Sequence, residues 1–114
     1  MGCNADDAAG FPDCRHEFMG HAERAIGAGI RGLVHCLRVE TPWLMMTKKE
    51  IVLWAELRPE ALEDVRESVS CYAGTRCGTC DACTLRERSF AEALVDDGSA
   101  VPVSFGGDPH RERP

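Results

Sequence analysis

The feature that most constrains this chain is a group of four cysteines, Cys71, Cys77, Cys80 and Cys83, spaced as C-x5-C-x2-C-x2-C. Four thiolates form a complete tetrahedral ligand set for Zn²⁺, and a spacer of two residues allows a tight turn to direct two sulfurs at one ion. Gly78 suits such a turn, because glycine tolerates a positive φ and lets backbone N–H groups approach the sulfurs. The pattern therefore predicts a structural zinc site.

Other interpretations of the four cysteines stay open, including a spacing that arose by coincidence. Disulfides form in exported proteins, and nothing in the sequence suggests export. An iron–sulfur cluster can use C-x2-C-x2-C, but the ferredoxin run continues to C-x3-C-P, and the residues after Cys83 do not. A redox pair of Cys80 and Cys83 would need exposed thiols of low pKa. Arg76 and Arg86 flank the cluster and would offset part of the charge of four thiolates.

Composition limits the classes of function. The chain has 114 residues, 44% hydrophobic and 28% charged, which is typical of one globular domain. Its net charge of −6 disfavours a nucleic-acid partner. No apolar run reaches the ~20 residues of a membrane span, and residues 1–7 lack the basic and apolar parts of a signal peptide. We therefore expect a cytoplasmic protein that binds neither membrane nor nucleic acid.

Hydrophobic periodicity and turn residues predict helices separated by one strand. Residues 1–12 read as a turn-rich run, and residues 98–114, with Pro and Gly, as a flexible tail. The alternation from Leu33 to Val39 predicts a strand. Four helices are expected. The first runs from an N-cap at Asp13 to Gly29, with Phe18 and Ile26 facing inward, and the second follows a capping box of Thr47 and Glu50. The third begins at Pro59, and the fourth runs from a cap at Asp81 to about Asp97, with Leu94 facing inward.

Other residues carry weaker signals. Lys48 and Lys49 lie at a predicted helix N-terminus, where the helix dipole favours anions, so they either bind a phosphate or carboxylate or are simply solvated. His16 and His21 are five residues apart and are predicted to be exposed rather than metal ligands. Cys14 would have a lowered pKa if it capped a helix, but a packed thiol is the preferred interpretation.

Three blocks together resemble the carboxyl-terminal half of the 7-cyano-7-deazaguanine synthases, a family of the PP-loop ATP pyrophosphatase superfamily. Residues 2–18 read GCNADDAAGFPDCRHEF, similar to the family's G-x-N-x-x-D-x-x-G-Y-P-D-C-R-x-E-F, with Phe11 in place of Tyr. Thr41-Pro42 and TKKEIV at residues 47–52 resemble T-P and T-K-x-E-I-V. Residues 70–86 resemble S-C-Y … C-G-x-C-D-x-C-x-L-R. The blocks occur in the family's order over residues 2–95.

The resemblance implies an α/β fold: a partial parallel sheet of an adenine-nucleotide-hydrolase-like, Rossmann-like domain with a helical zinc-binding carboxyl-terminal region. Residues 1–97 would be the carboxyl-terminal half of the synthase domain, with the zinc-binding segment at 70–90. The implied activity is that of an ATP-dependent ligase of queuosine biosynthesis, which converts 7-carboxy-7-deazaguanine and ammonia to the nitrile, with a homodimer left open. The resemblance makes the four cysteines zinc ligands and assigns no catalytic residue. Residues implied near the substrate are Asn4, Asp7, Asp13, Arg15, Thr47 and Lys48.

One departure from the family is large. The family holds ATP with S-G-G-x-D-S after its first strand, and this sequence contains no such hexapeptide. Two hypotheses follow. The chain is a fragment of the synthase whose first half lies upstream of Met1, or it is a short zinc-stabilised protein that binds a ligand or partner without turnover.

Overall fold

The computed structural model describes residues 1–32 and 36–98. The chain divides into two compact units, an amino-terminal unit, Met1–Thr47, and a carboxyl-terminal unit, Lys48–Pro114. Among the described residues all regular structure is helical, with no strand assigned. No helix in the described part of the chain combines the length and the apolar character that crossing a membrane requires.

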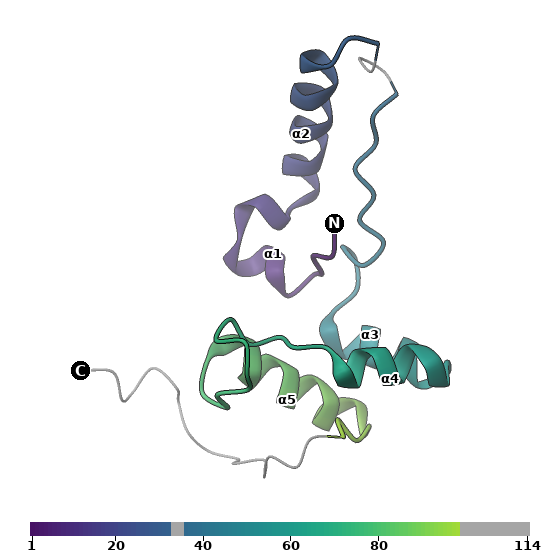
Figure 1. The fold of residues 1–114 in the computed structure, drawn as a ribbon, viewed down its shortest axis with the longest axis vertical. Coiled ribbons are helices and arrows are strands. Elements are labelled where there is room, and N and C mark those ends of the chain that lie inside the picture. The colour runs from purple at the N-terminus through teal and green to yellow at the C-terminus, as the bar shows by residue number, and fades with distance from the viewer. Residues whose placement is uncertain (33–35, 99–114) are drawn as a thin grey trace, which may run out of the picture. The chain divides into compact units, whose positions relative to one another are not determined.

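The amino-terminal unit holds a short helix α1 (Asp7–Gly10), a 3₁₀ turn η1 (Pro12–Cys14) and a longer helix α2 (His16–Gly29). Residues 37–40 return alongside α2 as an extended chain, as Figure 1 shows, and the Val39 N–H donates to the Glu23 carboxylate at 2.8 Å. A small core of Cys3, Met19 and Leu44, with Cys14 and Val39 against it, lies between these segments.

Several sequence predictions for this unit are wrong. The long helix begins at His16 and not after Asp13, because Arg15 has an extended backbone (φ −101°, ψ 151°) that separates η1 from α2. Met19 and Gly27 are its buried residues, whereas Phe18 and Ile26 are 42% and 46% exposed. Residues 1–12, predicted as turns, include helix α1.

The strand predicted from Leu33 to Val39 is not formed in its described part. Residues 33–35 lie outside the described residues, and residues 36–39 are a turn residue followed by extended chain. A strand requires a neighbouring strand with which to exchange backbone hydrogen bonds. Here the Val39 amide bonds to the Glu23 side chain instead. The expected parallel sheet is therefore absent from the described residues.

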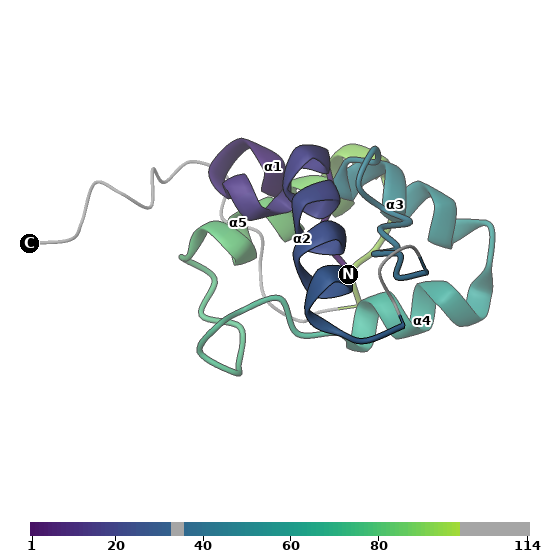
Figure 2. The ribbon, with the colours of Figure 1, turned by 90° about the horizontal axis from the view of Figure 1, so that it is seen from above.

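The carboxyl-terminal unit consists of α3 (Lys48–Glu56), α4 (Pro59–Glu67) and α5 (Asp81–Ala93). Helix α3 packs against both α4 and α5, and Figure 2 shows α3 and α4 side by side as the two arms of a hairpin. Pro59 occupies the first turn of α4, as predicted. The core contains Val52, Phe90, Ala93 and Val95, and Leu62 and Val65 of α4 pack against it.

Helix α5 is shorter than the sequence predicted. It ends at Ala93, because Leu94 adopts a left-handed backbone (φ 58°) and caps the helix through its own N–H. Leu94, expected inward, is 93% exposed, whereas Val95 turns back into the core. Of the predicted tail, Gly98 is described and residues 99–114 lie outside the described residues.

Candidate metal centre

Four cysteine sulfurs meet at the start of α5. Cys71 follows α4, Cys77 and Cys80 lie in the turn before α5, and Cys83 lies in its first turn. All four Sγ atoms lie within 4.8 Å of one another, and the pairs Cys77–Cys83 and Cys80–Cys71 are each 4.0 Å apart. Tetrahedral thiolates at ~2.3 Å from zinc are about 3.8 Å from one another. The sulfurs therefore fit a tetrahedral thiolate metal site and offer no open position.

The turn between Cys77 and Cys80 holds its sulfurs by local hydrogen bonds. Gly78 has φ +74°, the conformation that its sequence position predicted. The Thr79 hydroxyl donates to Cys77 Sγ at 3.6 Å, and the Cys83 N–H donates to Cys80 Sγ at 3.5 Å. N–H and O–H groups around ligand sulfurs orient them and stabilise their negative charge.

Cys80, rather than the predicted Asp81, is the N-cap of α5. Its backbone is extended (φ −80°, ψ 162°) and its sulfur accepts the Cys83 N–H, so a candidate ligand supplies the cap. Asp81 instead lies in the first turn of α5, where its charge complements the helix dipole. The register of α5 and the geometry of the sulfurs thus depend on each other.

The cysteines differ in their readiness to ionise. The backbone N–H and hydroxyl of Thr79, with further hydrogen bonds from Cys80, lower the pKa of the exposed Cys77 to about 6. Burial raises the pKa of Cys83 to about 11. A metal binds thiolates, so loading this site releases the protons that the metal-free thiols retain at neutral pH.

Comparison with known proteins matches this chain to one family. The family model described as queuosine biosynthesis protein QueC matches residues 1–94. The chain belongs to this family. Proteins named 7-cyano-7-deazaguanine synthase are similar to it: that of Gloeobacter violaceus is 46% identical over 99 residues, covering 83% of this chain and 42% of the relative. That of Anaeromyxobacter dehalogenans is 42% identical over 104 residues, covering 85% and 42%.

The QueC-family chain described here thus spans less than half the length of these relatives. A third, from Hydrogenovibrio crunogenus, is 37% identical over 105 residues and agrees in coverage, 85% of this chain and 43% of its own. No solved structure matches the chain.

Three of the residues that the QueC resemblance places near the substrate cluster around α1. Asn4 is buried, and its Oδ1 accepts the N–H groups of Asp6 and Asp7 at 2.9 and 3.3 Å. Asp7 Oδ2 accepts the Asn4 N–H at 2.9 Å, and Arg15 Nε donates to the Ala8 carbonyl at 3.0 Å. Asn4, Asp7 and Arg15 therefore hold α1 in place, whatever else they bind.

The remaining predicted residues lie in different settings. Asp13 is exposed in η1. Thr47 ends the amino-terminal unit, and the Met46 carbonyl beside it accepts the Ala5 N–H at 2.8 Å, next to Asn4. Lys48 begins α3, so the helix start that the capping box predicted is confirmed.

Among the weaker signals, His16 and His21 are exposed, as predicted. Burial, together with nearby Asp13, raises the pKa of Cys14, so Cys14 is the packed thiol and not the activated one.

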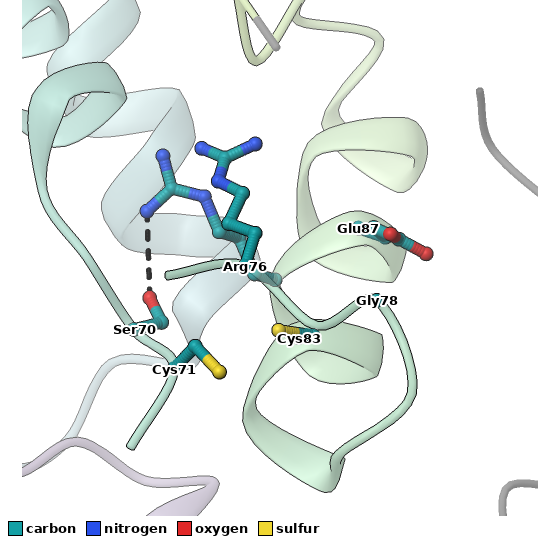
Figure 3. A pocket seen from close by; sticks show the side chains of 7 residues that line it. Ser70, Cys71, Arg76, Gly78, Cys83 and Glu87 are labelled. Carbon is teal, nitrogen blue, oxygen red and sulfur yellow. Dashed lines mark hydrogen bonds between the residues drawn. The ribbon is translucent and has the colours of Figure 1, made fainter. Parts of the chain in front are cut away.

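Sequence reasoning missed one residue of the metal centre's surroundings. Arg76 lines a small pocket beside Cys71 and Cys83 (Figure 3). Arg86 lines the same pocket, and both positions agree with the sequence, in which the two arginines flank the cluster. Both arginines also bind Asp97, for which the sequence predicts only the approximate end of the last helix. No sequence motif marks Asp97, because its partners Arg76 and Arg86 lie 21 and 11 residues away along the chain.

Proposed function

We propose that this chain is the zinc-binding, carboxyl-terminal part of a 7-cyano-7-deazaguanine synthase. The reaction would convert 7-carboxy-7-deazaguanine, ammonia and ATP to the nitrile. The carboxylate would attack ATP to form an adenylate with release of pyrophosphate, and ammonia would displace AMP to give an amide. A second adenylation, on the amide oxygen, would let that oxygen leave with AMP, and loss of the nitrogen's protons would complete the nitrile. The observation that carries the proposal is the family match over residues 1–94, to which the four converging sulfurs add an independent feature.

Zinc is the metal that we propose for the four cysteines. Four thiolates in a tetrahedral arrangement suit zinc, which has no redox chemistry and no geometric preference of its own. Its role would be to fasten the segment after α4 to the start of α5. Because the thiolates occupy every position, the proposed role is structural and not catalytic.

Five of the six residues predicted to bind the substrate belong to the amino-terminal unit, and Lys48 begins the carboxyl-terminal unit. We propose Asn4, Asp7, Asp13 and Arg15 for this role, together with Thr47 and Lys48. The hydrogen bond from Ala5 to Met46 supports a common location for Asn4 and Thr47. Lys48 in the first turn of α3 offers a positive charge to the substrate carboxylate or to a phosphate.

The parallel sheet of the PP-loop fold belongs to the same proposal. Side-chain exposure alternates in the extended chain, with Leu37 and Val39 partly buried and Arg38 and Glu40 exposed, which suits a strand once a neighbour pairs with it. We propose that ATP is the co-substrate and that its loop lies in the part of the relatives that this chain does not span. A cytoplasmic location and a homodimer stay predictions.

The experiment that tests the proposal is a chimera. Residues 1–94, which the family model matches, would replace the corresponding part of the Gloeobacter violaceus synthase, which is 46% identical over 99 aligned residues. With 7-carboxy-7-deazaguanine, ATP and ammonium, the chimera should yield the nitrile, detected by mass spectrometry. The matched control is the same chimera with Cys80→Ser. A chimera that folds, holds zinc and forms no nitrile would contradict the proposed activity.

A further inference from the structure

A buried arginine lies one turn beyond Cys83 on α5. Arg86 is 3% exposed, and a charge at that depth is stable only when it is paired and hydrogen-bonded. Its guanidinium donates to both oxygens of Asp97 at 2.6–3.2 Å. It also donates to three carbonyl oxygens at and after the end of α4, those of Val65 (2.9 Å), Arg66 (3.0 Å) and Ser68 (3.0 Å). Arg86 therefore ties α5 to the chain that leads into Cys71.

Asp97 extends this connection to the other side of the thiolate loop. Its two carboxylate oxygens also accept from Arg76 at 2.5 and 3.1 Å, and Arg76 directly precedes Cys77. The side chain of Asp97 is only 12% exposed, so its bonds to the two arginines are largely shielded from solvent. We call Arg76, Arg86 and Asp97 the clasp.

The clasp acts on the segments at both ends of the long spacer between Cys71 and Cys77. Within that spacer, residues 72–75 are exposed. Arg86 reaches the hydroxyl of Ser70 at 3.4 Å, immediately before Cys71 (Figure 3), while Arg76 lies immediately before Cys77. Cys83 is carried by α5 itself. Three of the four ligands are thus placed by the clasp and the helix that carries Arg86.

From this geometry we propose that the clasp positions the thiolates for metal binding. The inference rests on the proposed zinc site and adds residues outside its ligand set. Because the clasp restrains the chain beside Cys71 and Cys77 even when the metal is absent, the loop has less conformational freedom left to lose when the metal binds.

Charge favours the same role for the clasp. Two guanidinium groups and one carboxylate leave a net positive charge, next to a zinc tetrathiolate that is net negative. The nearby Glu87 lines the same pocket, but its carboxylate points away from the sulfurs of Cys71 and Cys83 (Figure 3).

The test is a zinc titration of the 114-residue chain against a competing chelator. Substitution of groups that orient metal ligands typically costs about 10–100-fold in metal affinity. We expect losses in that range for Asp97→Asn, Arg76→Gln and Arg86→Lys. Lysine keeps the charge of Arg86 but cannot reproduce its planar fork of donors. If only the charge of Arg86 mattered, the zinc affinity of this variant would equal that of the wild type. The matched control is Arg88→Gln, a 62% exposed arginine on the same helix that pairs with Glu92.

A spectrum separates positioning from general stability. Co²⁺ in place of zinc gives visible bands that report on the thiolate geometry. We expect the clasp variants to have altered bands, whereas Val52→Ala, which weakens the core of the same unit, keeps the wild-type bands once loaded. Equal changes in both would overturn the proposal.

The outcomes also distinguish the two levels of inference. A wild-type chain that binds no zinc refutes the metal centre itself. A wild-type chain that binds zinc, with clasp variants of unchanged affinity and unchanged bands, refutes only the clasp. Should Arg86→Lys not fold, Arg76→Gln decides, because Arg76 is 21% exposed and its loss leaves the Arg86–Asp97 pair in place.

Discussion

Removal of the metal should release the loop from Cys71 to Cys80, apart from its clasp contact at Arg76, and the first turn of α5, while the rest of the chain keeps its order. Within this loop Cys71 is the one buried residue. Ordering a backbone costs roughly 1–2 kcal/mol per residue, so these ten residues cost about 10–20 kcal/mol to hold. A structural zinc site contributes about 10–16 kcal/mol, which is of the size required. Burial of a single cysteine and one ion pair, from Arg76 to Asp97, are far too small to replace it.

Hydrogen exchange with and without a strong chelator measures this release. We expect the amides of Cys83 and Thr84, which donate to Cys80, to lose their protection together with the loop. Helix α2, in the other unit, should exchange at the same rate in both samples and serves as the internal control. Zinc-free protein that keeps full protection across residues 71–84 would refute the reasoning, because the loop would then hold its structure without the ion.

Further predictions concern single side chains of the carboxyl-terminal unit. Phe90→Ala should cost about 3–5 kcal/mol in a denaturant melt because it opens a cavity in the core, whereas Leu94→Ala, at a position 93% exposed, should cost little. Gly78→Ala should destabilise the metal-loaded chain by about 1–2 kcal/mol, because alanine is strained in a left-handed backbone. The φ of Gly78 is +74° and an added Cβ meets no neighbour, so the loss would come from backbone strain alone. Unchanged stability would contradict this. Burial tends to raise the pKa of Asp97, but hydrogen bonds from Arg86 and Arg76 outweigh it and hold the pKa below its usual value. The stability that Asp97 contributes is therefore complete above its unfolded pKa of about 3.9 and is lost as the pH falls through the lower folded value. Asp97→Asn should flatten this acid limb of a stability–pH curve, and an unchanged limb would contradict the assignment.

Local chemistry made the metal centre predictable from sequence. Ligand spacing and the need for a positive φ at Gly78 are properties of a few neighbouring residues, and the structure has both. The same holds for the start of α4 at Pro59 and of α3 after Thr47. Each is specified within one or two turns of chain, where few competing interactions exist.

The features that the sequence did not predict depend on tertiary contacts. Hydrophobic periodicity marked Phe18 and Ile26 as an apolar face of α2, but it does not tell what covers that face, and the structure buries Met19 instead. Alternation predicted a strand from Leu33 to Val39, and the structure has only extended chain at residues 37–39, because alternation does not supply the partner that makes a strand. Asp97 binds Arg76 and Arg86 across 21 and 11 residues of sequence, and no local pattern reports such a pairing.

Metal analysis of the purified chain tests the central claim most directly. If Cys71, Cys77, Cys80 and Cys83 form a closed thiolate site, elemental analysis should find about one zinc ion per chain, and Cys80→Ser should lose it. Protein prepared without chelator that contains no zinc, or that contains iron with sulfide, would contradict the account.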